Sequence, residues 1–431
     1  MAPTATSTAP RPLFLPCPQG VEVLLADEVR SLVADGTPLD AGRGGIFVQG
    51  DERVAMRLNL ESRLATRVLW PLAEGPYRDE HDLYALARGV PWARWITPAQ
   101  TLKVDVSARR SPLTSLNFAA LRIKDAVCDH LRDATGERPS VDIRNPDLAL
   151  VLHLGEERAA LYVDTSGEPL FKRGWREDKG DAPLKETLAA AMLAAAGWQG
   201  RSDAGGALHD PCCGSGTIAI EAAQIACGIA PGLKRRFAFE RLLPFATPEM
   251  RAELQRLRSH AQARIHASAV PIFASDVSFR MVDFARRNAQ RAGVEAAITF
   301  NGGDALERPA PELPADLPGT LMLNPPYGER IEVAGKAAPS ALPRVADDEP
   351  GNKALPDDFF ARLSAHWKRA YTQHPAGWTA HVLSPDMKLP GAMRLKESRR
   401  TPLWNGPIEC RLFRFDLVAG TMRSDAAGAP R

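Results

Sequence analysis

The sequence has no long apolar run, few cysteines and almost no net charge. None of its 431 residues lies in a stretch that approaches the roughly 18 consecutive apolar residues of a membrane-spanning helix, and the N-terminus has no apolar run typical of a secretory signal. The six cysteines include no pair at CxxC spacing and no Cys/His cluster at zinc-ligand spacing. These absences predict a cytoplasmic protein with no membrane partner, no metal and no disulfide framework.

The net charge of +2 says little about partners, but the charge is unevenly distributed. Residues 231–266 contain eight Lys and Arg against three Glu, and residues 388–414 contain seven against two. Such segments either neutralise nucleic-acid phosphates or form ordinary solvated helix faces. On sequence alone, the solvated face is the favoured interpretation.

The length predicts two or three domains, because a single core of this size is unusual. Apolar content of 45% and charged content of 25% are typical of a globular protein. Residues 1–12 are small, polar and rich in Pro and Thr, and we expect them to be disordered. We expect the same of the tail, residues 424–431.

The N-terminal part predicts a small α+β module. Residues 13–48 suggest strand, helix and strand, followed by a helix from Val54 to Leu69. Downstream come a strand at Thr101–Ser107, a helix at Asn117–Arg132, and strands at Leu148–Leu154 and Ala159–Asp164. Because this order carries no catalytic cluster, it favours a binding function.

The pattern changes beyond Gly167. An Ala-rich helix is predicted at Leu184–Ala196, and short apolar runs then alternate with helical patterns. The predicted strands are 207–209, 272–274, 298–300 and 319–323, with helices at 218–225 and 279–292. This alternation predicts an α/β domain with a parallel sheet covered by helices on both faces. Residues 334–356, rich in Ala, Pro, Asp and Gly, suggest a flexible insertion.

The segment Asp210-Pro-Cys-Cys-Gly-Ser-Gly-Thr217 closes a short strand and opens a helix. Gly214 and Gly216 allow a tight turn and a close approach of backbone to a ligand. The third glycine of a dinucleotide site is missing, and so is the GK[ST] of a phosphate loop. Asp210 would repel a phosphate but suits a ligand ammonium group.

Two further carboxylates follow later strands. Asp276 comes after the second strand and could accept hydrogen bonds from ribose hydroxyls, and Asp304 comes after the third and could accept one from an adenine amine. Each could instead cap a helix N-terminus. Three acids that close three successive strands favour a cationic nucleoside such as S-adenosylmethionine over NAD or ATP.

The fourth strand ends in a second motif, Thr320-Leu-Met-Leu-Asn-Pro-Pro-Tyr-Gly-Glu-Arg330. Pro325 and Pro326 stiffen the turn and offer no backbone donors. The side-chain oxygen of Asn324 and a backbone carbonyl are therefore free to accept from an amine. Tyr327 offers a face on which a base can stack, worth about 1–3 kcal/mol.

These two motifs resemble those of class I amino-methyltransferases that act on nucleic-acid bases. More closely, the chain resembles bacterial 23S ribosomal RNA guanine-N2 methyltransferases that carry a THUMP domain. The likeness extends to Phe47-Val-Gln-Gly50, Ser62-Arg-Leu-Ala-Thr-Arg67, Leu121-Arg-Ile-Lys-Asp-Ala-Val127, Phe171-Lys-Arg-Gly-Trp-Arg176, Ala230-Pro-Gly-Leu233 and Asn405-Gly-Pro-Ile-Glu-Cys410. Cys212 departs from the methionine common in the family, and Ser278 and Phe279 depart from its acidic or small residues.

The resemblance implies a Rossmann-like class I methyltransferase domain at 167–423. A ferredoxin-like region at 13–44 and a THUMP RNA-binding domain at 45–166 would precede it. The implied cofactor is S-adenosylmethionine, and the implied partner is RNA, foremost 23S ribosomal RNA within an assembling large ribosomal subunit.

The resemblance also assigns site residues. Asp210, Gly214, Gly216 and Thr217 would hold the methionine part of the cofactor, with Cys213 in the same turn; Asp276 would hold the ribose and Asp304 the adenine. Asn324, Pro325, Pro326 and Tyr327 would hold the target base and its amine. No covalent nucleophile is implied, and both cysteines of the turn are interpreted as packing residues.

Other functions stay open. An adenine-N6 or DNA amino-methyltransferase would use the same Asn-Pro-Pro-Tyr geometry, and a transfer-RNA guanine-N2 target is closer still. A non-catalytic RNA-binding or ribosome-assembly protein would not need Asp210, Asp276, Asp304 and Asn324 together. An NAD oxidoreductase is disfavoured by the missing glycine and by the Asn-Pro-Pro-Tyr turn.

Overall fold

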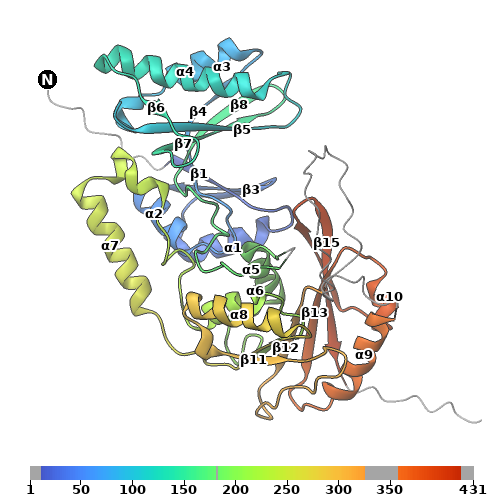
Figure 1. The fold of residues 1–431 in the computed structure, drawn as a ribbon. Coiled ribbons are helices and arrows are strands. Elements are labelled where there is room, and N and C mark those ends of the chain that lie inside the picture. The colour runs from blue at the N-terminus through green and yellow to red at the C-terminus, as the bar shows by residue number, and fades with distance from the viewer. Residues whose placement is uncertain (1–10, 181–182, 326–357, 419–431) are drawn as a thin grey trace, which may run out of the picture. The chain divides into compact units, whose positions relative to one another are not determined.

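The computed structural model describes residues 11–180, 183–325 and 358–418 (Figure 1). The chain forms two compact units. The first comprises Met1–Arg176, Lys185–Ala191 and Gly228–His266, and the second comprises Glu177–Leu184, Met192–Cys227 and Ala267–Arg431. The predicted insertion, the predicted tail and residues 1–10 lie outside the described residues. Residues 11 and 12, expected to be disordered, belong to the first strand.

The first unit is built on an eight-stranded sheet with the order β2-β3-β1-β4-β8-β7-β5-β6. The strands are β1 (Arg11–Pro16), β2 (Leu39–Gly42), β3 (Gly45–Gly50), β4 (Leu69–Pro76), β5 (Thr101–Ala108), β6 (Ser140–Val141), β7 (Leu148–Leu154) and β8 (Arg158–Asp164). Neighbours pair antiparallel, except that β5 pairs parallel with β6 and β7. The sequence prediction of β5, β7 and β8 is confirmed to within one residue.

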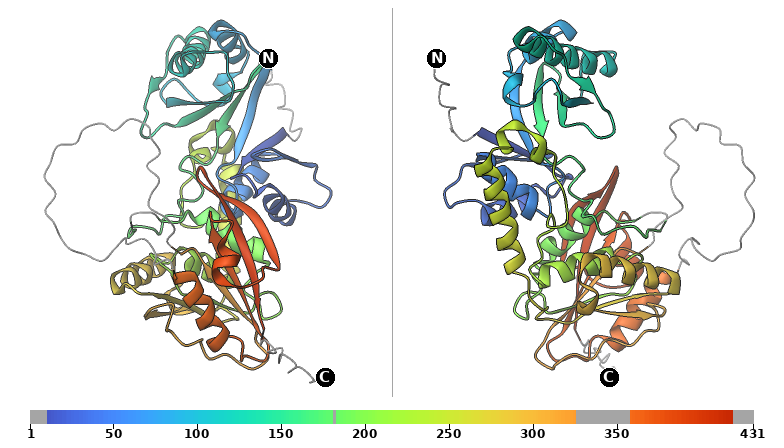
Figure 2. Two further views of the ribbon diagram at one scale, coloured as in Figure 1. Left: turned by 90° about the vertical axis from the view of Figure 1, so that its right-hand side faces the viewer. Right: turned by 60° about the vertical axis from the view of Figure 1, so that its left-hand side comes forward.

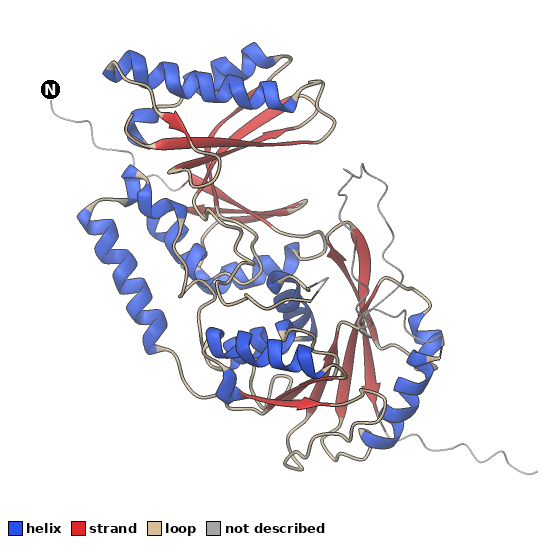
Figure 3. Ribbon diagram, in the orientation of Figure 1, coloured by secondary structure: helices blue, strands red, loops and turns tan. Residues whose placement is uncertain are grey.

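Helices of the first unit cover this sheet in two groups. They are α1 (Glu22–Leu32), α2 (Glu52–Glu61), α3 (Glu80–Arg88), α4 (Leu116–Thr135) and α7 (Pro248–Ala263). α3 and α4 pack against each other and against β4 and β5 (Figure 3). α7 packs on α2, so Gly228–His266 folds with elements far from it in sequence.

The helix predicted from Val54 to Leu69 is wrong in its second half. α2 ends at Glu61, and Leu69 already begins β4. The carboxylate of Glu28 on α1 accepts hydrogen bonds from the Ser62 hydroxyl and from the amides of Arg63 and Leu64. These amides are therefore bonded to a tertiary partner, which the local apolar spacing could not reveal.

The second unit is built on a seven-stranded sheet with the order β11-β10-β9-β12-β13-β15-β14. Its strands are β9 (Ala207–Asp210), β10 (Ile272–Asp276), β11 (Ile298–Gly302), β12 (Gly319–Leu323), β13 (Trp378–Ser384), β14 (Arg399–Asn405) and β15 (Ile408–Leu417). The first five of these are parallel, as predicted for the four that the sequence revealed. β14 and β15 form an antiparallel hairpin at one edge, coloured red in Figure 2.

Crossovers in this sheet run in both directions from β9 and β12. The chain passes from β9 through α6 (Thr217–Ala226) to β10 and through α8 (Phe279–Ala292) to β11. From β12 it moves the other way, through α9 (Phe359–Ala370) to β13, and then through α10 (Leu389–Met393) to β14. Right-handed crossovers in opposite directions place their helices on opposite faces, which Figure 1 shows.

Two apolar layers therefore enclose the sheet. α9 and α10 bury Leu363, Trp367 and Met393 against Leu321, Val382 and Phe413 of the strands. The Ala-rich helix predicted at 184–196 is α5 (Glu186–Ala196), whose residues are divided between the two units. Among the described residues, no helix is both long and apolar enough to span a membrane, and no three metal-ligating side chains gather.

Candidate cofactor and base-amine site

The polar residues singled out from the sequence leave the sheet at one edge. β9, β10, β11 and β12 are parallel neighbours, so their carboxyl ends share that edge. Leu321 lies opposite His209, which places the ends of β12 and β9 side by side. β9 and β12 are also where the crossovers diverge, the position at which open α/β sheets bind ligands.

The turn after β9 uses its two glycines differently. Both have a positive φ, 52° at Gly214 and 90° at Gly216. A Cβ on Gly216 would lie 2.9 Å from the Cβ of Ala285, so this glycine lets α6 pack closely on α8. A Cβ on Gly214 would meet only the Met281 methyl at 3.9 Å, so this position borders open space. Gly214 is therefore the better candidate to face a ligand.

Asp210 is buried, yet only half of its carboxylate has a partner. Its Oδ1 accepts from the Cys212 amide at 3.2 Å. Its Oδ2 is buried and has no hydrogen-bond donor among the residues that the structure describes. Burial raises the pKa of Asp210 well above its ordinary value, and the neighbouring Asp276 carboxylate raises it further. A buried acceptor without a donor calls for an explanation, and a bound cationic group supplies one.

Asp276 and Asp304 are joined to the same loop system. Asp276 Oδ2 accepts from the Gly214 amide at 2.9 Å and its Oδ1 from the Ser278 amide at 2.9 Å. Burial raises the pKa of Asp276. Asp304 Oδ1 accepts from the Leu306 amide at 2.9 Å. Neither residue caps a helix, the alternative that the sequence left open, because Ser278 is the N-cap of α8 and no described helix begins directly after Asp304.

The two cysteines of the turn are protonated packing residues. Burial raises the pKa of Cys213 well above its usual value, and the Asp210 carboxylate raises it further. The same two causes act on Cys212, which also feels Asp276 and Asp304. Because a nucleophilic cysteine needs a thiolate, neither residue suits covalent chemistry.

His209, the residue before Asp210, belongs to the sheet interior. Its two ring nitrogens lie 3.0 Å from the Tyr371 hydroxyl and 3.3 Å from the Ser275 hydroxyl. Burial lowers the pKa of His209 to about 3, with Arg308 as a second cause. The imidazole is therefore neutral at physiological pH and holds neighbouring strands and helices together.

Asn324 follows β12 directly and is half-buried. Its Oδ1 is buried without a hydrogen-bond donor in the described part of the chain. Pro325, the next residue, is buried. Pro326 and Tyr327, the other residues assigned to the target base, lie outside the described residues.

The sequence did not point to Asn288, which lies beside the turn after β9. Asn288 of α8 is fully buried, and its Nδ2 donates to the carbonyls of Ser215 at 3.0 Å and Asp178 at 2.8 Å. Its Oδ1 accepts from the amides of Glu177 and Asp178, both at 3.3 Å. Asn288 therefore ties the turn to residues 177–178, which are far away in sequence. An asparagine on the buried face of an amphipathic helix was the available signal.

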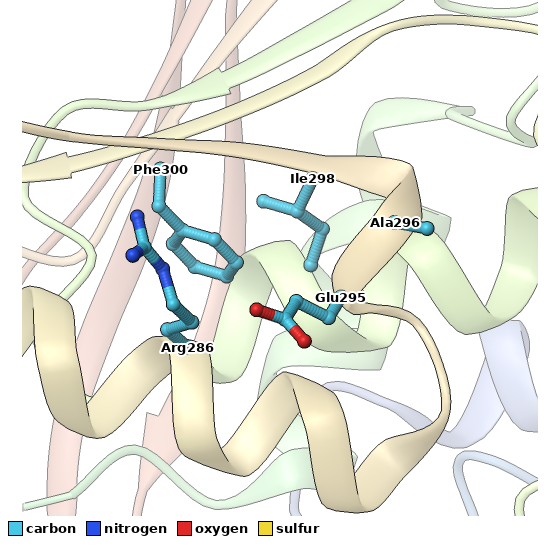
Figure 4. A pocket seen from close by; sticks show the side chains of 5 residues that line it. All are labelled: Arg286, Glu295, Ala296, Ile298 and Phe300. Carbon is cyan, nitrogen blue, oxygen red and sulfur yellow. The ribbon is translucent and has the colours of Figure 1, made fainter.

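In the described part of the second unit, two cavities have linings that do not include these three acids. One, of about 390 Å³, is lined by Arg286, Glu295, Ala296, Ile298 and Phe300 beside the start of β11 (Figure 4). The other, of about 260 Å³, lies between His209, Phe273 and the loop from Arg308 to Glu312. The first is at the amino end of β11, opposite to the edge where the carboxylates gather.

Comparison with protein families identifies three successive domains. The RlmL ferredoxin-like domain matches residues 12–69, the THUMP domain matches residues 77–164, and the RMKL-like methyltransferase domain matches residues 173–342. The chain therefore carries the domains of the THUMP-containing class I methyltransferases. The fold predicted from the sequence, a Rossmann-like methyltransferase domain behind a ferredoxin-like and THUMP region, is confirmed.

The curated relatives that this chain matches are longer proteins. A ribosomal RNA large subunit methyltransferase K/L from Syntrophotalea carbinolica is 38% identical over 98% of this chain and 56% of its own length. The protein of the same name from Pseudomonas paraeruginosa is 36% identical over 94% of this chain and 52% of its own. The chain thus spans about half the length of the curated relatives it matches.

Solved structures support the same fold. SMU.472, a methyltransferase crystallised with SAH, is 26% identical with a TM-score of 0.78 and covers 94% of this chain and 98% of its own. A Listeria monocytogenes protein described as an N6-adenine-specific DNA methylase is 25% identical with a TM-score of 0.77, over 94% and 96% of the two chains. The names of the curated relatives specify ribosomal RNA and no base, whereas the description of the Listeria protein specifies adenine N6 of DNA.

Proposed function

We propose that this chain transfers a methyl group from S-adenosylmethionine to an exocyclic base amine of RNA, with guanine N2 of 23S ribosomal RNA as the target. The observation that carries the proposal is the pair of buried acceptors at one sheet edge, Asp210 Oδ2 and Asn324 Oδ1, without donors among the described residues. A ligand ammonium suits the first, and a base amine suits the second. The proposed setting is an assembling large ribosomal subunit in the cytoplasm.

The residues at this edge fit S-adenosylmethionine. Asp210 would accept from its ammonium group, and Gly214 leaves room for its methionine part. Asp276 has a second lone pair on each oxygen for ribose hydroxyls, beyond the two amides that it already accepts. Asp304 would accept from the adenine amine. When bound, this cofactor supplies a methyl group made electrophilic by its sulfonium.

Asn324 and Pro325 would act on the incoming amine. The lone pair of a guanine N2 is delocalised into the ring, which makes this nitrogen a poor nucleophile. Acceptance of its two N–H groups by Asn324 Oδ1 and the Pro325 carbonyl would favour a tetrahedral nitrogen and spread its growing positive charge. Positioning of the amine opposite the methyl group would supply most of the remaining acceleration. Tyr327 would stack on the base once it has left its helix.

Methyl-labelled S-adenosylmethionine tests this proposal directly. The protein is incubated with protein-free 23S, 16S and transfer RNA, alongside an Asn324→Ala variant and an Asn145→Ala control, whose altered side chain is exposed in the first unit. We expect N2-methylguanosine in 23S RNA, reduced about 100-fold or more in Asn324→Ala and unchanged in the control.

Each other outcome has its own meaning. Label in transfer RNA would keep the mechanism and replace the target. N6-methyladenosine would keep the amine chemistry and replace the base, in line with the Listeria relative. No label in any RNA or in immature ribosomal particles would leave the non-catalytic RNA-binding protein as the better proposal.

A further inference from the structure

Most cations of the first basic segment, residues 231–266, are neutralised within the first unit. Arg236 and Arg258 pair with Glu240, Arg256 with Glu253, Arg264 with Glu61 and Arg241 with Asp147. The buried Arg235 donates to the backbone carbonyls of Glu168, Pro169 and Lys172. Because these guanidinium groups already have partners, this segment holds the first unit together.

The second basic segment, residues 388–414, is different. Three of its seven cations are paired: Arg400 with Glu397, Arg411 with Glu409 and Arg414 with Asp416. The other four, Lys388, Arg394, Lys396 and Arg399, are all exposed. No ion pair is recorded for these four among the residues that the structure describes. Within the described residues, these four charges therefore have no neutralising partner.

These four cations surround one short helix. Lys388 precedes α10 and Arg394 follows it. The Nζ of Lys368, an exposed residue on α9, donates to the Arg394 carbonyl at 3.1 Å, which adds a fifth cation to the group. Lys396 and Arg399 continue from there into β14, the edge strand of the sheet. We call Lys368, Lys388, Arg394, Lys396 and Arg399 the α10 patch.

The α10 patch begins at the same sheet edge as the proposed catalytic asparagine. β13 runs parallel to β12, so Lys388, four residues beyond the end of β13, leaves the sheet on the side of Asn324. From there the patch extends back along the β14 edge of the sheet. In the strand register, Arg399 of β14 lies opposite Arg414 of β15, which lies opposite His381 in the middle of β13. The patch thus begins on the side of the sheet where Asn324 lies and extends away from it.

We propose that the α10 patch binds the phosphate backbone of the RNA that carries the target base. This inference rests on the proposed function, because it takes RNA as the substrate. Exposed, unpaired Lys and Arg gain the most from a polyanion, since each phosphate that they neutralise releases condensed counterions. Contacts to phosphate position the strand and read no sequence. The patch therefore strengthens binding and orients the RNA at the site, while Asn324 and its neighbours select the base.

Salt-dependent RNA binding tests the patch. The test variant is Lys388→Gln/Lys396→Gln/Arg399→Gln in the full chain. The control variant, Arg236→Gln/Arg251→Gln/Arg256→Gln, removes the same charge from exposed positions of residues 231–266. Dissociation constants for protein-free 23S RNA are measured by filter binding from 50 to 200 mM salt, and SAH affinity is measured by calorimetry.

We expect the test variant to bind RNA about tenfold or more weakly at low salt, with a slope of log affinity against log salt shallower by about 2. The control should stay within about twofold of the wild type, and both variants should keep wild-type SAH affinity. If the test variant bound RNA as tightly as the control variant does, the proposed role of the α10 patch would be wrong, and the proposed function would be unaffected. Weaker binding with an unchanged salt slope would also overturn it. A wild-type protein that binds no RNA would overturn both proposals.

Discussion

Buried polar side chains occur in both units, but they meet different partners. In the first unit, Asn59 donates to the Thr165 hydroxyl at 2.8 Å and accepts from the Ser166 hydroxyl at 2.6 Å. Those two hydroxyls also bond to the backbone of Val68. At the carboxyl edge of the second sheet, Asp210 and Asn324 each keep a buried oxygen without a donor among the described residues.

The difference separates stability from binding. A closed network of hydrogen bonds stabilises the fold that contains it, because every member would lose a partner on unfolding or substitution. A buried acceptor without a donor costs stability unless a water, an ion or a ligand completes it. The two basic segments show a related contrast: most cations in residues 231–266 are paired, whereas those around α10 have no ion pair among the described residues.

The largest effect is expected where the network is closed. Asn59→Ala removes hydrogen bonds to Ala55, Thr165 and Ser166, all in the interior. The free energy of unfolding of the first unit should fall by about 2–3 kcal/mol in urea denaturation. SAH affinity of the folded variant should not change. A large loss of SAH affinity with unchanged stability would reverse the comparison.

Asp210→Asn should have the opposite effect, because Asp210 Oδ2 is a buried acceptor without a donor among the described residues. This substitution removes a buried carboxylate whose pKa is raised, so stability should stay equal or increase at neutral pH. SAH affinity should fall about 10- to 100-fold, because a charge-assisted hydrogen bond to the ligand ammonium is lost. Calorimetry and urea denaturation of the same preparation measure both quantities. Unchanged SAH affinity would remove Asp210 from the site.

Asn288 combines the two roles, stability and binding. Its side chain has hydrogen-bond partners on every side, and one of them is the Ser215 carbonyl in the turn that we propose binds the cofactor. Asn288→Asp keeps an acceptor for the amides of residues 177 and 178 but turns an oxygen toward the Ser215 and Asp178 carbonyls. SAH affinity should fall about tenfold. Gln290→Glu makes the same amide-to-acid change at an exposed position of α8 and should have no effect.

A positioning role for Asn288 has a further signature. The introduced acid can donate a hydrogen bond only when it is protonated, so part of the SAH affinity of Asn288→Asp should return at lower pH, relative to the wild type. A variant that loses thermal stability in parallel with SAH affinity, with no pH-dependent recovery, would show a purely structural role.

The smallest effect concerns pH. The raised pKa of Asp210 means that its carboxylate takes up a proton at a higher pH than an ordinary aspartate does. A ligand ammonium favours the ionised carboxylate, so SAH affinity should decline as the pH falls through that raised pKa, by less than about tenfold per pH unit. Asp210→Asn should lack this component. The same pH profile in wild type and variant would assign the decline to another group.

Much of the second unit could be predicted from the sequence alone. Strands 207–210, 272–276, 298–302 and 319–323 are short apolar runs closed by polar or glycine residues, and helix 279–292 was predicted to the residue. This succeeds because a parallel sheet buries both faces, and its carboxyl ends collect the ligand residues at predictable places. Family resemblance then gave each acid its expected role.

Other features depended on residues distant in sequence, and only the tertiary structure decided them. α2 stops at Glu61 because Glu28 of another helix binds the next amides. Residues 228–266 fold with the first unit because α7 packs on α2. Residues 231–266 and 388–414 have equal net charge but differ in how many of their cations form ion pairs, because ion pairing depends on which acidic side chains the fold places nearby. The sequence by itself determined the pattern of strands, helices and ligand-type residues, because that pattern is local; the structure decided which polar groups have partners, because partners meet through folding.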